Sequence, residues 1–304
     1  MPTSIKRETN QFDGLSEETR HLLIKGVYDQ ARVDDFREFK DRIENEVLQH
    51  PVIVANPFTP WFEQGTFTVQ QAREFLRQFS VFSNEFLVAQ LRKMLNADSL
   101  EEMRAGKEIL ANEIGVTFKG GSGQSGKDKD LGAADGSVDG GIFRFRAAHF
   151  ELLLRMAEHL GLEFKDLGKR RFGWPSTLYF CDELVRLYGS DDYVTGNAAS
   201  FAVENWAAAG FWDELIRGWN IFKERECPDL PLIFFSWHAK IEANHAQHTQ
   251  DELEEYFFNN EVDQNRFIND ANEMLDGVYE FWRGLAEMID DEDKDANNSL
   301  EPNK

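Results

Sequence analysis

The chain has little of what several large protein classes depend on. Only two cysteines, Cys181 and Cys227, occur among its 304 residues, and they form no CxxC spacing. The spacing that would mark a zinc knuckle or a redox pair is therefore absent, and a reducing intracellular compartment fits best. No run of about 18 apolar residues occurs, and the N-terminal residues lack the apolar segment of a signal peptide. We therefore expect a cytoplasmic protein that does not enter a membrane.

Positive charge is also scarce. The 33 Lys and Arg residues face 55 Asp and Glu residues, which gives a formal net charge of -22. Such a balance repels phosphate backbones and anionic membrane surfaces, so neither nucleic acid nor membrane is an expected partner. Part of the acidic excess lies in residues 290–304, which are polar and predict a disordered tail.

The third scarce feature is the alternation of apolar and polar residues that marks β-strands. Apolar residues recur instead at spacings of three and four, which predicts an all-α protein. With 41% hydrophobic residues and 26 Phe, residues 1–289 can form one helical domain. The expected helices span residues 15–32, 34–49, 68–95, 98–115, 143–161, 175–189, 195–225, 231–259 and 263–289.

One internal segment breaks the helical pattern. Residues 119–141 consist mainly of Gly, Ser, Asp and Lys, so we predict a flexible surface insertion. A lid that closes over a bound substrate is the alternative interpretation.

The strongest local motif is FFSWHAKIEANHAQH at residues 234–248. His238, Glu242 and His245 follow the spacing i, i+4, i+7, which places them within an arc of roughly 60° on one helix face. Two imidazoles and a carboxylate directed into one volume suit a metal ion. The apolar run before them indicates burial, where these groups need a partner. The alternative is a pair of half-exposed histidines that contact Glu242 on an amphipathic helix.

Four further polar residues lie inside apolar helical stretches: Glu85, Glu113, His149 and Glu204. A lone carboxylate there is costly to bury. Each of the four, taken alone, is also consistent with a hydrogen-bonded core residue or a helix-end charge. Taken together, inward carboxylates and histidines on separate helices are typical of carboxylate-bridged di-iron proteins.

The ferritin-like form of such a site is not met. It repeats Glu-x-x-His on two helices. Glu242 and His245 supply one copy, but Ala207 stands three residues after Glu204. The second copy is therefore missing.

In their order along the chain, these residues resemble the haem-oxygenase-like di-iron oxidases and oxygenases, also described as iron-containing redox enzymes. That family's pattern is a Glu on an early helix, a second Glu followed by a His, a third Glu, and a closing His-x3-Asp-x2-His. The resemblance covers residues from about 70 to 250, at Glu85, Glu113, His149, Glu204, His238, Glu242 and His245.

The sequence departs from the family pattern at two points. Glu242 replaces the more common Asp. The Gly-rich insertion also separates Glu113 from His149 by more chain than is usual, which leaves His159 as a competitor for the role of His149.

The resemblance implies a haem-oxygenase-like helical bundle that holds two Fe(2+) ions per chain through these seven residues. It implies O2 and a small molecule as substrates, and it is compatible with an electron donor and with a homodimer. The acidic composition favours a cationic or zwitterionic substrate. We therefore expect N-oxygenation or oxidative C–C or C–N cleavage of an amino acid or amine; the alternative on the same site is a fatty-acid decarboxylase or desaturase.

Three interpretations without a di-iron site stay open. A metal-free thiaminase-like or cofactor-biosynthesis enzyme would need a nucleophile, for which Cys181 is the candidate. A haem-binding relative would need an early ligand such as His21, which lies in a polar context. An acidic interaction protein would use the histidines only to satisfy each other. Aromatic residues near the predicted ligands belong to the core or shield the site: Phe82, Phe86, Trp206, Phe211, Trp212 and Trp237.

Overall fold

The computed structural model describes residues 14–118, 134–135, 143–242 and 245–298. Side chains are described within 14–116, 146–240 and 250–289. The N-terminal part contains α1 (Glu17–Ile24), α2 (Gln30–Glu46), α3 (Pro51–Val54), α4 (Thr59–Phe62), α5 (Val69–Leu95) and α6 (Leu100–Glu113). Three strands and three helical elements follow: β1 (Val116–Phe118), β2 (Ala134–Asp135), β3 (Phe143–Phe145), α7 (His149–His159) and the short 3-10 helices η2 (Phe164–Asp166) and η3 (Arg170–Phe172).

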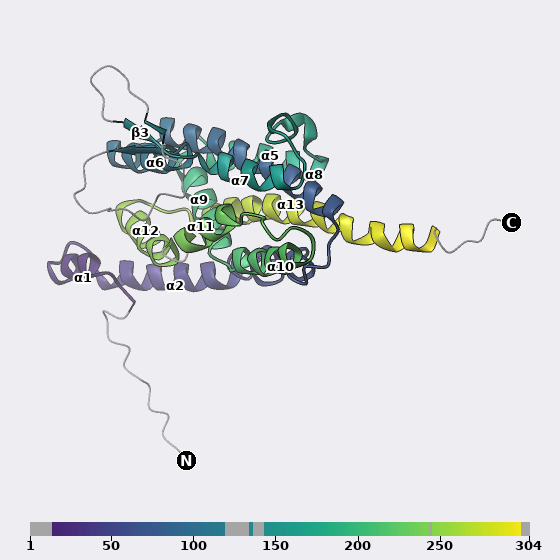
Figure 1. Cartoon of the computed structure of the whole chain (residues 1–304). Coiled ribbons are helices and arrows are strands. Elements are labelled where there is room, and N and C mark those ends of the chain that lie inside the picture. Colours follow the sequence, from purple (N-terminus) through teal and green to yellow (C-terminus); the bar gives the residue numbers. More distant parts are fainter. Residues whose placement is uncertain (1–13, 119–133, 136–142, 243–244, 299–304) are drawn as a thin grey trace, which may run out of the picture.

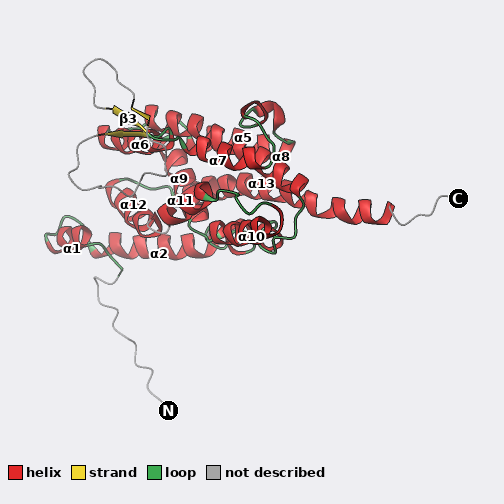
Figure 2. Cartoon of the chain, in the orientation of Figure 1, coloured by secondary structure: helices red, strands yellow, loops and turns green. Residues whose placement is uncertain are grey.

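The C-terminal part is helical. It contains α8 (Pro175–Glu183), the π-helix η4 (Leu184–Tyr188), α9 (Tyr193–Ala207), α10 (Phe211–Glu226), α11 (Ile233–Glu242), α12 (His245–Asn259) and α13 (Gln264–Asn298). Figure 2 shows helices throughout, with the short strands gathered at one end of the molecule. The predicted all-α class is confirmed, with this small sheet as an addition.

The long helix α5 begins at a capping box that the sequence encodes. The Thr68 hydroxyl accepts a hydrogen bond from the backbone N–H of Gln71, and the Gln71 side chain accepts one from the Thr68 backbone. This arrangement satisfies donors that the first helical turn leaves unpaired. The helix ends at Asn96, as the sequence predicted.

Several predicted helices were wrong in their extent. The predicted helix 15–32 ends at Ile24, and Phe143–Phe145, at the start of the predicted helix 143–161, form β3. Residues 195–225 form two helices, α9 and α10, separated at Gly210. Gly210 adopts a positive φ of 92°, which glycine reaches without the steric cost that a side chain would add. The chain therefore changes direction there, and α10 starts anew with Asp213 and Glu214 in its first turn.

Helix α13 is central to the packing of the bundle. It packs along α9 and α8, while α5 packs against α6, α7, α8 and η4. Helix α10 contacts α4 on one side and α11 on the other. Figure 1 shows α13 running through part of the body and extending beyond it at its C-terminal end.

The core between these helices is largely aromatic. Trp282 of α13 is fully buried, and its ring lies 5.4 Å from the ring of Phe211 and 5.8 Å from that of Phe58, centroid to centroid. Trp219 of α10 is also fully buried, with the ring of Phe62 at 5.2 Å. Large rigid rings bury much surface for little loss of rotamer entropy, so this core holds the helices in fixed relative positions.

A small antiparallel sheet joins α6 to α7. Its strand order is β1-β3-β2, with Val116 opposite Phe145 and Ala134 opposite that same residue on the other edge. Ala134 and Asp135 belong to the predicted insertion 119–141. The rest of that insertion lies outside the described residues, so its predicted flexibility and its role as a lid stay predictions.

The last helix is longer than expected. Helix α13 continues to Asn298, into the segment 290–304 for which the sequence predicted a disordered tail. Extending an anchored helix requires no new nucleus, which explains how a polar sequence continues it. Within the described residues, every helix is too short or too polar to cross a lipid bilayer.

The contact between α10 and α4 predicts an unusual response to alanine. A Cβ atom on Gly218 would overlap the backbone carbonyl oxygen of Phe62. Alanine favours a helix over glycine by about 1 kcal/mol, but overpacking costs about 1–3 kcal/mol. We expect Gly218→Ala to lower the free energy of unfolding, measured by urea denaturation.

The matched control is Gly196→Ala in α9. There the nearest atom, the carbonyl oxygen of Ser190, lies 3.8 Å from the added Cβ. This variant should gain up to about 1 kcal/mol of stability. Equal stabilisation by both substitutions would show that α10 and α4 are not in close contact.

Candidate metal centre

Three of the seven predicted ligands meet in the interior of the bundle. Glu113 ends α6, His149 begins α7, and His238 lies in α11. One potential ligand atom from each residue lies within 4.8 Å of the others. Three separate helices thus bring two imidazoles and one carboxylate into a volume the size of a metal site.

The small sheet explains how Glu113 and His149 meet despite the insertion between them. Gly115, with a φ of 73°, turns the chain from α6 into β1. Its carbonyl oxygen accepts a hydrogen bond of 2.7 Å from the N–H of Arg146, next to the end of β3. Pairing of β1 with β3 therefore closes the base of the insertion, and the length of chain beyond that base matters little.

His149 is buried next to the carboxylate of Glu113. Its ring nitrogen Nδ1 lies 2.9 Å from Glu113 Oε2, but the two atoms are not aligned as a hydrogen bond, and Nδ1 forms no hydrogen bond with the residues that the structure describes. His149 is 5% exposed, so this nitrogen cannot turn to water. An unsatisfied buried ring nitrogen costs about 1–3 kcal/mol. A metal ion between the imidazole and the carboxylate would satisfy both.

His238 is held with one ring nitrogen turned toward its own helix. Its Nδ1 lies 2.7 Å from the carbonyl oxygen of Phe234 and is therefore the donor, which leaves Nε2 with the lone pair. Trp212 stacks on the ring at 4.9 Å with an interplanar angle of 17°, and the ring of His149 lies at 4.8 Å, edge to face. The aromatic neighbours fix the plane in which Nε2 lies.

Burial lowers the pKa of His238 to about 4, against the opposing negative charge of Glu113 and with the additional effect of His149. The ring is therefore neutral at pH 7. Neutral imidazole is the form that binds metal ions, so no proton has to leave His238 before a metal binds.

Glu204 is not among the three described residues whose potential ligand atoms lie within 4.8 Å of one another. It is half-buried on α9, and its negative charge acts on Lys93 and Tyr188. The remaining two predicted ligands cannot be placed: Glu242 is the last residue of α11 and His245 the first of α12, and their side chains lie outside the described residues. Their roles stay predictions.

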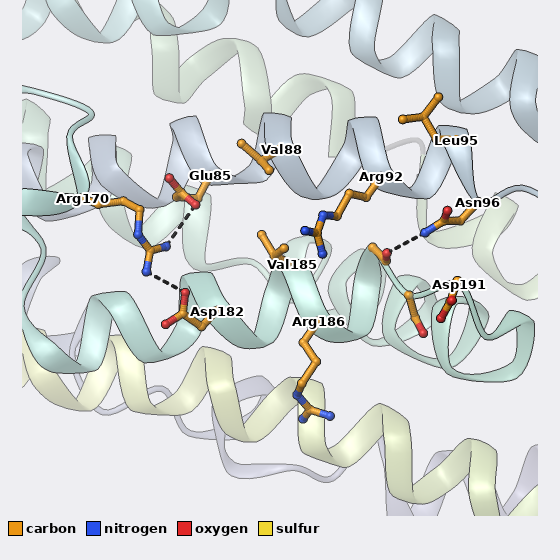
Figure 3. A pocket seen from close by; sticks show the side chains of 12 residues that line it. Glu85, Val88, Arg92, Leu95, Asn96, Arg170, Asp182, Val185, Arg186 and Asp191 are labelled. Atoms are coloured by element: carbon orange, nitrogen blue, oxygen red, sulfur yellow. Dashed lines mark hydrogen bonds and ion pairs between the residues drawn. The ribbon is translucent and has the colours of Figure 1, made fainter.

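Glu85 faces away from the interior cluster. It forms an ion pair of 3.1 Å with Arg170, whose guanidinium also contacts Asp182 at 2.6 Å. Figure 3 shows this pair at one end of an open cleft between α5 and the α8–η4 segment. The cleft measures about 770 Å³, and none of Glu113, His149 and His238 lines it.

The phase of α5 accounts for the position of Glu85. Val88 and Arg92, three and seven residues further on, line the same outer cleft. Phe82 and Phe86 point to the core side and contact Phe180 and Tyr188 respectively. Because Glu85 shares the outer face, we do not include it among the ligands that we propose.

A polar group near Glu204 had no place in the sequence interpretation. Lys93 of α5 is half-buried and donates a hydrogen bond to Ser200 of α9. Its ammonium lies 4.6 Å from the ring centroid of Tyr188, whose hydroxyl donates a hydrogen bond of 2.6 Å to Gln90. The spacing of Lys93 from Phe86 places it on the apolar face of α5, a signal that was available. Tyr188 ends a π-helix, which periodicity does not reveal.

Comparison with known proteins supports the fold. No protein-family model matches the sequence, and no curated protein matches it. A CADD-like protein of unknown function from Nostoc punctiforme PCC 73102 has a TM-score of 0.53 at 16% identity, covering 89% of this chain and 99% of that one. A TenA homolog from Pseudomonas syringae pv. tomato str. DC3000 has a TM-score of 0.53 at 12% identity, covering 84% and 93%.

At these identities the likeness shows the fold alone, which is the haem-oxygenase-like helical bundle. The predicted fold is therefore confirmed. The fold is shared by di-iron and by metal-free thiaminase-like enzymes, so the comparison does not decide between them.

The low pKa of His238 predicts a pH-dependent stability of the metal-free protein. Between pH 6.5 and 4, His238 binds a proton in the unfolded chain but not in the folded one. The contribution of His238 to the free energy of unfolding is therefore fully present above pH 6.5 and is lost as the pH falls toward 4. We expect this residue to account for a loss of about 2 kcal/mol between pH 7 and 4.5. Urea unfolding in EDTA, with His238→Gln beside the parent chain, measures it.

The control for this experiment is His159→Gln. His159 lies at the end of α7 and is exposed, with Nδ1 2.8 Å from the carbonyl oxygen of Arg155. This variant should retain the parent's pH dependence, whereas His238→Gln should flatten it. An unchanged pH dependence in His238→Gln would mean that the imidazole is not buried in its neutral form.

Proposed function

We propose that the chain is a non-haem iron enzyme that uses O2 to oxidise a small molecule, with Glu113, His149 and His238 holding an iron ion. The observation that carries this proposal is the interior cluster itself, in which three potential ligand atoms lie within 4.8 Å of one another. The Nδ1 atom of buried His149 supports it, because this atom lies beside the Glu113 carboxylate but forms no aligned hydrogen bond with any described residue.

The chemistry of the ligand set favours iron. Two histidines and one carboxylate are the set that non-haem Fe(II) oxygenases use, and they leave coordination positions open for O2 and substrate. Bound iron would supply the electrons that reduction of O2 requires. Zinc also accepts these ligands, so the metal is assigned from the ligand set together with the resemblance of the sequence to iron-containing redox enzymes.

The residues around the cluster prepare it for this role. The Phe234 carbonyl fixes the tautomer of His238, and the Trp212 ring fixes its orientation. Buried Phe234 and Trp212 also exclude water from that side of the imidazole. Water exclusion protects reactive oxygen species from side reactions.

The complete form of the proposal contains two irons per chain. The second would use Glu204, Glu242 and His245, with the first held by the cluster of three. Helices α9, α11 and α12 supply these residues and pack together, α12 against both α9 and α11. An external electron donor would return the irons to the reduced state between turnovers.

We propose an amino acid or amine as the substrate, converted by N-oxygenation or by oxidative C–C or C–N cleavage. The formal net charge of -22 supports a cationic group on the substrate. Fatty-acid decarboxylation or desaturation is the alternative on the same site. Both reactions require bound iron, so metal binding is tested before any substrate is screened.

The metal-free alternative depends on Cys181, and its surroundings do not favour a nucleophile. Cys181 is fully buried in α8. Burial raises its pKa to about 12, and the negative charge of Glu85 acts in the same direction while Arg170 opposes it. Only the thiolate is nucleophilic, and reactive cysteines have lowered pKa values.

The burial of Cys181 predicts selective alkylation. Iodoacetamide at pH 8 should modify half-buried Cys227 in the native protein and leave Cys181 unmodified until urea is added. We expect the rates at the two sites to differ at least about 100-fold, because little Cys181 thiolate forms. Mass spectrometry of peptides reads both sites. Faster modification of Cys181 than of Cys227 would restore the metal-free alternative.

Metal binding tests the proposed function directly. Apo-protein titrated anaerobically with Fe(II) should bind at least one ion per chain, and mixing with O2 should consume it in a reaction visible by stopped-flow absorbance. Glu113→Gln and His238→Gln should weaken Fe(II) binding at least about 100-fold, because each removes a ligand. His159→Gln, a surface histidine on α7, should bind as the parent does.

The result that contradicts the proposal is equally clear. If the parent chain shows no saturable Fe(II) binding, or if the Glu113 and His238 variants match it, the cluster is not a metal site. Circular dichroism of each variant confirms that the helical bundle is intact.

A further inference from the structure

We propose that a series of tryptophan rings protects the metal centre by carrying oxidising equivalents away from it to the protein surface when no substrate is bound. The series begins at Trp212, beside His238, and ends at half-buried Trp61. This inference rests on the proposed function, because only an oxidising centre can start the transfer. It gives a second function to residues outside the ligand set.

The series starts at the ring that covers a proposed ligand. Trp212 of α10 stacks on the imidazole of His238, with the ring centroids 4.9 Å apart and the planes inclined by 17°. Phe234 and His149 are the other described rings in contact with this imidazole. Of these three neighbours, the indole is the one that is most readily oxidised by one electron. Trp212 is therefore the ring that can donate an electron to the centre through His238.

Short steps connect Trp212 to two further indoles. The Phe211 ring lies 4.6 Å from that of Trp212 and 5.4 Å from that of Trp282, centroid to centroid. The ring of Phe58 lies 5.8 Å from Trp282 at an interplanar angle of 23°, and 5.5 Å from Trp61. One phenyl ring thus separates each indole from the next. Electron tunnelling weakens exponentially with distance, so these short steps are faster than one long step to the surface.

The N–H groups of the inner indoles are the second observation. Nε1 of Trp212 and Nε1 of Trp282 are buried, and neither forms a hydrogen bond with a described residue. A buried donor without a partner is costly, and a phenyl ring would pack there without that cost. What an indole offers beyond a phenyl ring is its one-electron oxidation. Because no acceptor is in contact, the proton stays on the oxidised ring, which then needs only an electron from the next indole.

Trp61 differs from the two inner indoles in its exposure. It is half-buried on α4, whereas Trp212 is 7% exposed and Trp282 is 0% exposed. At Trp61 water can accept the N–H proton of the oxidised indole, and a reductant in solution can reach the ring. The oxidising equivalent therefore comes to rest where it can be repaired.

Each transfer moves one electron toward the centre. Trp212 loses an electron to the oxidised centre, Trp282 restores Trp212, and Trp61 restores Trp282. Trp61 then loses its Nε1 proton to water, and a thiol in solution returns one electron and one proton to it and becomes a thiyl radical. Indoles are oxidised by strong oxidants alone, so the series conducts after reaction with O2 and not when an electron donor reduces the iron. Such a route limits oxidation of the proposed ligands themselves.

The test locates the radical and does not depend on turnover of a substrate. Fe(II)-loaded protein is mixed with O2, without substrate or thiol, in the presence of a nitroso spin trap that adds to carbon-centred radicals. EPR measures the amount of trapped radical, and mass spectrometry of peptides identifies the residue that carries it. We expect the adduct at Trp61 in the parent chain, and its loss when a thiol is present.

Trp174 is the internal control. It is half-buried against the same core as Trp61, but it shares no ring contact with the members of the series. A radical that formed in solution would reach both half-buried tryptophans, whereas the series delivers it to Trp61. Trp174 should therefore carry no adduct, and Trp174→Phe should leave the adduct at Trp61 unchanged.

Two variants interrupt the series at its ends. Trp212→Phe keeps an aromatic ring on His238 and removes the first indole, so the adduct at Trp61 should be lost while Fe(II) binding, measured on the same sample, is retained. Trp61→Phe removes the last indole and lies outside the cluster of ligands. In that variant the radical should stay on the inner indoles Trp212 and Trp282, where EPR of rapidly frozen samples detects it without a trap. This second variant keeps the test decisive should Trp212→Phe fail to fold.

Three results would overturn the inference: adducts at Trp174 or at Trp237, which precedes His238 in the chain; an adduct at Trp61 that persists in Trp212→Phe; and no tryptophan radical although Fe(II) is bound and O2 is consumed. In each case the proposed metal centre stands, because it binds iron. Absence of Fe(II) binding in the parent chain would instead remove the proposed function and this inference together.

Discussion

The structure depends on a polar cluster that is buried in an aromatic core. Removing an imidazole nitrogen and a carboxylate from water is costly unless each finds a partner. Here Nδ1 of His149 has Glu113 beside it without an aligned hydrogen bond, and His238 has its second nitrogen turned inward. Well-packed apolar residues in place of a whole buried ionic pair are often neutral or favourable for stability, so such a cluster is not explained by stability alone. A bound ligand would supply the partners that the cluster lacks.

The rest of the molecule can be understood as the support for that cluster. The β1–β3 pairing brings the end of α6 and the start of α7 together. The aromatic rings of α10 and α11 set the plane of His238, and α10 is itself fixed on α4 by the close approach at Gly218. Ligands held by packed helices and by hydrogen bonds lose little entropy when a metal binds. Residues well outside the cluster therefore help to hold the three ligands in position.

Much of this arrangement could be predicted from the sequence, and what could not be predicted has physical reasons. Helical periodicity gave the fold class and the extent of α5 because it reports which residues face the core. It missed the break at Gly210 because a single glycine inside an apolar pattern is compatible with a continuous helix. The candidates Glu113, His149 and His238 stood out as polar residues in apolar surroundings, and the structure brings them together.

Glu85 stood out by the same criterion and lies elsewhere. Its neighbours in sequence are apolar, but they do not show which side of the helix Glu85 faces. Successive residues are rotated by about 100°, so a residue at the edge of the apolar face can point either to the core or to the outer cleft. Lys93 had no place in the sequence interpretation. A long lysine side chain can pass along apolar surface and place its ammonium against buried partners.

The likeness to CADD-like and TenA proteins gives the fold, and the fold does not give the reaction. Two chains with this bundle differ in chemistry according to which side chains reach the interior. In this chain the interior holds two imidazoles next to a carboxylate, whereas its one buried thiol has a raised pKa and lies on the side of Glu85 and Arg170. A nucleophilic mechanism would require the opposite environment for that thiol. The distribution of these groups, rather than the shape of the bundle, is what favours a metal-dependent enzyme.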